Sequence, residues 1–189
     1  MPRPFSDFTD QFFWSFKRMD NVNYNFETIE VLYAAKKANN NNLHFNKPII
    51  ILIISIIECT LYDFIMRIHQ YRQDSFPNIT QAIVSFFRNS SETDELKVLI
   101  PQIQTHNLLR VSKSDNLYTD LEHLRKIRNR VHIQNKYLMK PIDEYAVFTE
   151  MEMVRSQQCL EKVYDALCNV YPRWKKQPIP MSDFPRPWL

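Results

Sequence analysis

The stretch PIIILIISIIECTLYDFIMRIHQYR, residues 48–72, carries the strongest signal about the fold. Its apolar residues recur every three to four positions, which is the spacing of an α-helix. The isoleucine-rich half alone is also compatible with a strand, because β-branched residues favour sheets. The half that follows Glu58 keeps the helical spacing, and a proline at position 48 is typical of a first helical turn. We therefore predict one long, buried core helix over residues 47–72.

The uninterrupted apolar run within this stretch, residues 48–57, favours a buried helix over a membrane span. The run is about half as long as a bilayer crossing requires, and the charged Glu58 follows at once. The first residues of the chain, MPRPFSDFTDQFFWSFKRM, are aromatic and partly acidic, unlike a secretory signal peptide. These features predict a cytoplasmic protein that makes no membrane contact.

Composition narrows the classes of function. Of 189 residues, 44% are hydrophobic and 24% are charged, as in an ordinary soluble domain, and a net charge of +3 permits an anionic partner. The chain has no glycine, which excludes the phosphate-binding and dinucleotide-binding loops that need positive φ angles. Its three cysteines, Cys59, Cys159 and Cys168, form no CxxC pair. This cysteine usage argues against a zinc finger and is typical of a reduced, intracellular protein.

Helical spacing extends over most of the chain. The asparagines at 39–42 predict a turn, Pro101 is expected to bend or restart its helix, and Thr149 with Glu152 forms a capping box at the start of the last helix. Besides the core helix, the predicted helices are a short first one that contains the phenylalanines of residues 5–16, and five others over residues 26–38, 78–87, 96–109, 117–134 and 149–170.

The predicted fold is an all-α helical bundle that forms a single domain over residues 1–171, with residues 1–45 as an N-terminal helical extension. Residues 172–189 contain five prolines and predict an extended C-terminal tail. Trp174, Phe184 and Trp188 alternate with these prolines, so we expect the tail to dock on its own domain or on a partner.

Basic residues border an apolar face in the stretch LRKIRNRVHIQN, residues 124–135. At 100° per residue, the apolar residues of this helix fall within one arc of roughly 120°. Arg128 falls inside the arc, and Arg125 and His132 lie at its edge. The helix thus presents two guanidinium groups and one imidazole in a half-shielded column.

Glu58 is expected to need a cationic partner. It follows an unbroken apolar stretch and has Ile54 and Leu61 on its own helix face, where an unpaired carboxylate is costly. An arginine suits this place, because a planar guanidinium binds a carboxylate through two hydrogen bonds. We therefore predict that Glu58 pairs with Arg125 or Arg128.

The stretch LRKIRNRVH resembles the motif of the HEPN family, which is an arginine, four to six residues and a histidine, often with a polar residue directly after an arginine. Six residues separate Arg125 from His132. Arg128 is followed by Asn129 but stands only three residues before His132, so both arginines are candidates for the motif arginine. The resemblance covers the order of elements over residues 47–170.

The resemblance implies an all-α, HEPN-like domain and a metal-independent endoribonuclease without a cofactor. His132 is then the acid–base group, and Arg125 or Arg128 holds the scissile phosphate. Asn129 orients these groups together with Glu58, whose helix resembles the long early helix of the family. The expected products carry a 2′,3′-cyclic phosphate, and DNA is expected to resist because it lacks the 2′-OH.

The resemblance also implies a homodimer in which the motifs of two subunits face one cleft. It implies RNA as the substrate and a role as a toxin or anti-phage (antiviral defence) effector that attacks the RNA of its own cell. An antitoxin or sensor protein is a further expected partner. In one toxin–antitoxin branch a tyrosine two residues after the histidine is modified; position 134 holds glutamine here, so this modification is not expected.

Two other functions stay open. Lys126 and Arg130 point toward solvent on the helix of Arg125 and Arg128, and this basic string can bind RNA phosphates without cleaving them. Some HEPN proteins are such non-catalytic, RNA-binding or regulatory modules. The third function is that of a purely structural oligomerisation domain.

A few further residues have expected places. Glu122 and Asp63 are expected at the solvated surface, and His123 is expected to have a surface or structural role. Cys159 and Cys168 are nine residues apart on one predicted helix and therefore lie on opposite faces, so we expect no disulfide between them.

Overall fold

The structure is a computed structural model that describes Phe13 and residues 16–70, 79–89, 95–112, 114–131, 143–171 and 186–189. This described part is helical and contains no strand, which confirms the predicted all-α class. In chain order its elements are the helices and 3₁₀ turns α2 (Phe16–Ala38), η1 (Leu43–Phe45), α3 (Asn46–Gln70), α4 (Gln81–Asn89), α5 (Leu96–Thr105), α6 (Leu117–Arg128), η3 (Asn129–Val131), α7 (Glu144–Val147) and α8 (Glu150–Val170).

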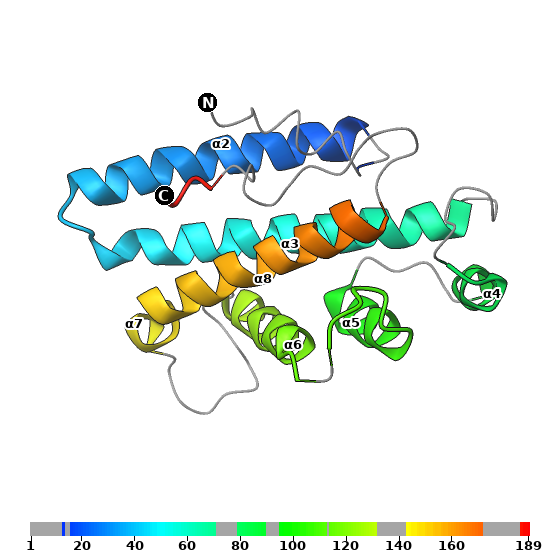
Figure 1. The fold of residues 1–189 in the computed structure, drawn as a ribbon. Helices are drawn as coiled ribbons and strands as arrows, with labels where there is room; N and C mark the ends of the chain where they lie inside the picture. Colours follow the sequence, from blue (N-terminus) through cyan, green and yellow to red (C-terminus); the bar gives the residue numbers. More distant parts are fainter. Residues whose placement is uncertain are drawn as a thin grey trace.

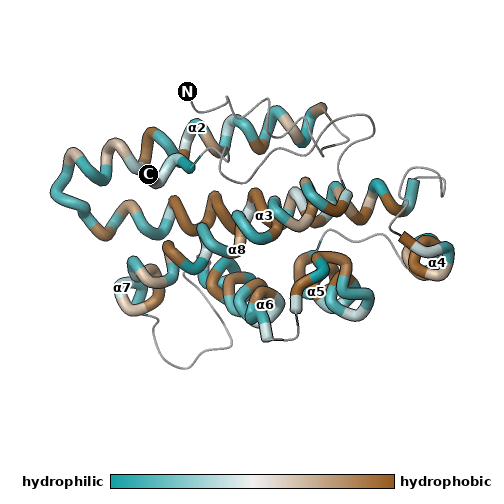
Figure 2. The backbone as a smooth tube through the Cα atoms, in the orientation of Figure 1, coloured by the Kyte–Doolittle hydropathy of each residue, from teal (hydrophilic) through white to brown (hydrophobic). Residues whose placement is uncertain are grey.

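Helix α3 lies at the centre of the fold. Figure 1 shows α2 alongside it and α8 crossing it, with α4, α5 and α6 set across the remaining side, and each of these helices contacts α3. Apolar residues recur along α3 in Figure 2, and its isoleucines from Ile49 to Ile57 are mostly buried. A helix that is apolar on most of its surface has to be covered from several sides, and this requirement explains the arrangement of the other helices.

The core helix was predicted over residues 47–72 and is observed at Asn46–Gln70, with Pro48 in its first turn. Because the helix continues well past Glu58, it is long and apolar enough in composition to cross a membrane. However, 67% of its most apolar 18-residue window is buried inside the protein. This burial agrees with the predicted role of α3 as a core helix.

Helix α2 begins ten residues earlier than predicted, at Phe16 instead of residue 26. Polar residues dominate its first half, yet Met19 and Val22 continue the face of Phe26 and pack in or against the core. The predicted turn at 39–42 is confirmed. Asn40 and Asn41 adopt φ angles of 53° and 56°, a region that asparagine tolerates better than most residues.

Other boundaries also differ from the predictions. Helix α5 continues through Pro101, so the expected restart there is wrong, and it ends at Thr105 instead of residue 109. The helix predicted over 117–134 changes to a 3₁₀ turn after Arg128. The expected connector after it includes the short helix α7, whose first N–H groups bond to the side chain of Asp143.

The cap of the last helix is confirmed in one of its two parts. Thr149 Oγ1 accepts a hydrogen bond from the N–H of Glu152 at 3.3 Å. The Glu152 carboxylate does not complete the box; it binds His123 and Arg155 instead.

Asp63 was expected at the surface and is instead fully buried. Arg18 of α2 reaches across to α3, and its Nη1 lies 2.9 Å from Asp63 Oδ1. The same guanidinium lies over the ring of Tyr62, 4.8 Å from its centroid. The sequence of α3 alone does not predict this burial, because the guanidinium that offsets the cost of burying the carboxylate comes from Arg18 of α2.

Several predictions fall on residues outside the described part of the chain. They concern the first helix around Phe5, Phe8 and Phe12, and the aromatic residues Trp174 and Phe184 of the tail. The last four residues are described, and they dock on the domain itself. Trp188 lies next to Tyr33 with ring centroids 6.5 Å apart, while the docking predicted for the rest of the tail falls on residues outside the described part of the chain.

We predict that Arg18→Met lowers the free energy of unfolding by about 3 kcal/mol, because it leaves the buried Asp63 carboxylate without its guanidinium. Lys17→Met, at the exposed neighbouring position, is the control and is expected to change stability by less than about 0.5 kcal/mol. Chemical denaturation measures both. Equal effects of the two variants would show that the ion pair contributes nothing.

We also predict that Trp188→Ala lowers the free energy of unfolding by about 1–2 kcal/mol, because a partly buried aromatic side chain leaves the core surface. Leu189→Ala changes the adjacent, almost fully exposed residue and is expected to be neutral. Thermal unfolding followed by circular dichroism compares the two. An unchanged transition in Trp188→Ala would contradict the docking.

Candidate functional site

A cleft of about 540 Å³ opens where α3, the start of α5 and the end of α6 meet. Its lining residues come from three parts of the chain that lie far apart in sequence. They are Ser55, Glu58, Cys59 and Tyr62 from α3, Glu95, Leu96 and Lys97 at the start of α5, and Arg125, Arg128 and Asn129 at the end of α6. Four of the seven residues selected from the sequence, Glu58, Arg125, Arg128 and Asn129, thus line one cleft.

The predicted ion pair of Glu58 is present, and its partner is Arg128. The two side chains meet with Nη2 of Arg128 3.0 Å from Oε2 of Glu58. The carboxylate is largely shielded on α3, and the guanidinium is 44% exposed at the last residue of α6. A guanidinium has five N–H donors, so one carboxylate contact leaves this group with capacity to bind a further anion.

Arg125 has a different partner, Glu122, one turn earlier on α6. The Nε and Nη2 atoms of Arg125 donate to the two carboxylate oxygens at 2.7 Å and 2.5 Å. Glu122 was expected to be solvated, and its side chain is 37% exposed while it makes this two-point contact. The hydrogen bond from Arg125 lowers the pKa of the Glu122 carboxyl, and the same bond raises the pKa of Arg125.

The exposure of the two arginines is the reverse of what the helical projection predicts. Arg128 was placed inside the apolar arc and Arg125 at its edge, yet the side chain of Arg125 is 20% exposed and that of Arg128 is 44% exposed. The reason is the position of Arg128 at the end of α6. The α-helix changes to a 3₁₀ turn directly after Arg128, so no further turn of α-helix follows to cover its side chain.

The remaining selected residues lie elsewhere. Lys126 is exposed, as predicted, and lines a separate hollow with Glu122 and His123. Arg130 is half-buried in the 3₁₀ turn that follows α6, instead of pointing freely into solvent. His132, the predicted acid–base group, lies outside the described residues.

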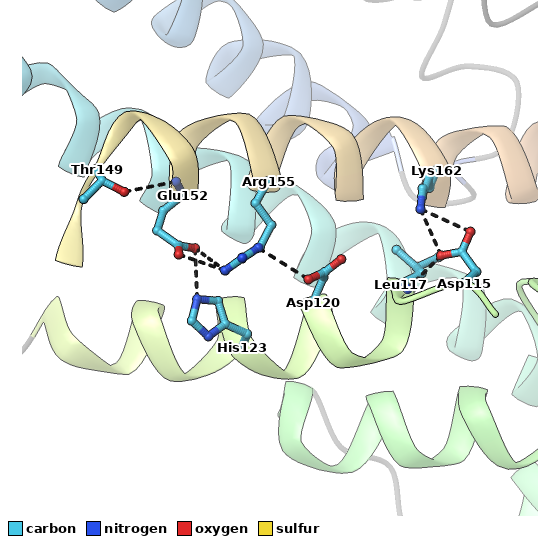
Figure 3. A network of polar contacts seen from close by, with 8 residues as sticks. All are labelled: Asp115, Leu117, Asp120, His123, Thr149, Glu152, Arg155 and Lys162. Atoms are coloured by element: carbon cyan, nitrogen blue, oxygen red, sulfur yellow. Dashed lines mark hydrogen bonds and ion pairs between the residues drawn. The ribbon is translucent and has the colours of Figure 1, made fainter. Parts of the chain in front are cut away.

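Polar contacts join helix α6 to α8. Figure 3 shows Glu152 of α8 between His123 of α6 and Arg155 of its own helix, and Arg155 also reaches Asp120. The His123 Nε2 atom lies 2.9 Å from Glu152 Oε2, which gives this histidine the structural role expected of it. These contacts connect α6, which carries the two cleft arginines, to α8.

Sequence analysis did not select three charged or nucleophilic residues of the cleft: Cys59, Glu95 and Lys97. Burial, and secondarily the neighbouring Asp63 carboxylate, raise the pKa of the Cys59 thiol to about 11. Cys59 is therefore a neutral thiol at neutral pH, not an activated nucleophile. The start of α5 carries no motif, so only the tertiary contact between α5 and α6 reveals Glu95 and Lys97.

The cleft is lined by side chains of both charges. Two guanidinium groups, one ammonium and one side-chain amide lie there together with the carboxylates of Glu58 and Glu95. Guanidinium groups match the geometry of phosphate oxygens. In the described part of the chain, no group of three or more His, Cys, Asp or Glu side chains is placed to hold a metal ion. Cys59, Cys159 and Cys168 are free thiols, which agrees with the expected lack of a disulfide.

We predict that the Glu122 carboxyl titrates below its ordinary pKa of 4.5 and returns toward it in Arg125→Ala, because the Arg125 hydrogen bond is the main cause of the shift. Lys126→Ala removes a weaker contact, at 3.8 Å, and is expected to move the pKa less. Carboxyl-carbon NMR measures the titration. Since folding lowers this pKa, the stabilisation by the pair is present above the unfolded pKa and disappears as the pH falls through the folded one. A Glu122 pKa that does not change in Arg125→Ala would contradict the contact.

A scan against protein-family models, a search of curated proteins and a search of solved structures each found no match for this chain. The resemblance to the HEPN family therefore stays a prediction from the motif residues.

Proposed function

We propose that this chain is a HEPN-like, metal-independent endoribonuclease whose active site includes the cleft between α3, α5 and α6. The observation that carries the proposal is the convergence of Arg125, Arg128 and Asn129 on that cleft, with Glu58 bound to Arg128. These are the residues that the family motif would place around a scissile phosphate.

In the proposed reaction the ribose 2′-oxygen attacks the adjacent phosphorus, and the bond from phosphorus to the 5′-oxygen breaks. The 2′-OH loses its proton and the leaving 5′-oxygen gains one, so the products are a 2′,3′-cyclic phosphate and a 5′-hydroxyl end. His132 serves as the acid–base group, since an imidazole titrates near neutral pH. The guanidinium groups of Arg125 and Arg128 offset the charge that develops on the phosphate oxygens.

The carboxylates of Glu58 and Glu122, which bind the two arginines, are consistent with this proposal. Glu58 and Glu122 hold the guanidinium groups at 3.0 Å or less, and orientation before substrate binding lowers the entropic cost of reaching the transition state. Phosphate oxygens then accept hydrogen bonds from the guanidinium N–H groups that the carboxylates do not occupy. In this arrangement Glu58 and Glu122 position the arginines and do not themselves contact the phosphate.

The wider biological proposal follows the family. The active form is a homodimer in which two such clefts come together, and it acts as a toxin or anti-phage effector under the control of an antitoxin or sensor protein. RNA of the same cell is the target.

A non-catalytic, RNA-binding or regulatory module is the second candidate. It is favoured by the fact that both cleft arginines already carry carboxylate partners. In such a module the cleft binds RNA phosphates through the same residues, and no bond is broken.

We predict that the purified chain cleaves RNA in the presence of EDTA and leaves 2′,3′-cyclic phosphate ends. His132→Ala is expected to lower the rate by about 10²–10⁴-fold through loss of acid–base catalysis, and Arg128→Ala by about 10²-fold or more through loss of charge stabilisation. His44→Ala, at an exposed position on η1, is the matched control and is expected to keep full activity. Gel analysis of end-labelled RNA measures all four proteins.

Three outcomes separate the candidates. Loss of activity on chelation, or equal cleavage of a 2′-deoxy substrate, would contradict the proposed reaction. Binding of RNA without cleavage would support the regulatory module instead. A wild-type protein that neither binds nor cleaves RNA would contradict both.

A further inference from the structure

Three basic side chains line the cleft, and one of them was not selected from the sequence. Lys97 stands in the first turn of α5, and the other two, Arg125 and Arg128, come from the last turn of α6. Since α5 and α6 pack against each other, the cleft receives positive charge from two of its three walls. An anionic chain that crosses from α6 toward α5 would therefore meet a cation at each end of its path.

The immediate surroundings of Lys97 leave it able to engage a ligand. Its side chain is 64% exposed, and its Nζ lies 2.9 Å from Oε2 of the equally open Glu95. Ion pairs between exposed side chains are weak and easily exchanged. A lysine is also a mobile point charge on a four-carbon stem, which suits it to follow a phosphate that is not fixed in one orientation.

Lys126 offers a closely matched comparison. Its side chain is 63% exposed, and it too lies near a glutamate, with its Nζ 3.8 Å from Glu122. However, Lys126 is not among the cleft residues and lines a separate hollow with His123. One helical position separates it from Arg125, which turns it about 100° away around the helix. The two lysines therefore differ mainly in whether they reach the cleft.

We propose that Lys97 is the third phosphate-binding cation of the cleft, and that it binds the backbone phosphate next to the one held by Arg125 and Arg128. The RNA strand then runs from the end of α6 to the start of α5. The proposal rests on the proposed function for the identity of the ligand, since it takes RNA as the anion. It assigns to Lys97 the role that the sequence suggested for Lys126.

Glu95 is expected to oppose the binding that Lys97 promotes. Its carboxylate lines the same cleft and pairs with Lys97, so it repels a phosphate and competes with it for the ammonium group. Its side chain makes no capping hydrogen bond to the first turn of α5. Glu95→Gln is therefore expected to strengthen the binding of an anionic chain.

The test uses the full chain and a single-stranded 2′-fluoro oligoribonucleotide, which lacks the attacking hydroxyl and is not consumed. Fluorescence anisotropy measures its affinity at several salt concentrations. Lys97→Ala is expected to weaken binding by roughly three- to tenfold at about 100 mM salt and to lower the slope of log affinity against log salt by about 0.7, the loss of one phosphate contact on a single strand. Lys126→Ala is expected to change both quantities much less, and Glu95→Gln is expected to tighten binding.

Equal effects of Lys97→Ala and Lys126→Ala, or no binding by the wild type, would overturn the proposal. Circular dichroism of each variant establishes that the fold is kept. If RNA is bound and Lys97→Ala has its selective effect, but unmodified RNA stays intact, the proposed endoribonuclease function is wrong and the role of Lys97 stands. If RNA is cleaved but Lys97→Ala has no selective effect, the endoribonuclease function stands and the role of Lys97 is wrong.

Discussion

Helix α3 is apolar on most of its circumference, and its burial requires partners on several sides. Helices α2 and α8 cover its length, and α4, α5 and α6 cover what is left. The three crossing helices are short, so they leave openings between their ends. The cleft occupies one such opening, where the apolar surface of α3 is interrupted by Ser55, Glu58 and Tyr62. The same helix thus supplies the core and one polar wall of the candidate site.

Electrostatic pairing determines how this site is held together. Each basic residue of the cleft has an acidic neighbour: Glu58 for Arg128, Glu122 for Arg125 and Glu95 for Lys97. These pairs are partly exposed, so each adds little to stability. Glu58 and Glu122 orient the two guanidinium groups, whereas the pair of Lys97 with Glu95 is open to solvent and easily exchanged. The network of His123, Glu152 and Arg155 in Figure 3 has the complementary task of holding α6 against α8.

Much of the core and part of the site could be predicted from the sequence. The long apolar period of α3 and the Thr149 cap of α8 are local signals, and both identify real helices. The partner of Glu58 was predictable because a shielded carboxylate needs a cation, and the arginines of the motif helix were the natural source. The start of α2 was missed because polar residues hide the helical period carried by Met19 and Val22.

The residues whose positions were not predicted from the sequence are placed by contacts between helices. Asp63 is buried because Arg18 arrives from α2, and Lys97 belongs to the cleft because α5 packs against α6. A helical projection likewise misjudged Arg125 and Arg128, since it contains neither the end of α6 nor the helices around it. Pairwise packing of distant segments leaves no local pattern, so periodicity and motif spacing do not reveal it.

We propose that the cleft between α3, α5 and α6 binds the phosphate backbone of RNA. A crystal structure of the full chain with a 2′-fluoro oligoribonucleotide would locate the bound strand. We expect a backbone phosphate within hydrogen-bonding distance, about 3 Å, of the guanidinium group of Arg125 or Arg128. An oligonucleotide seated on another face, with both arginines still held only by Glu122 and Glu58, would contradict it.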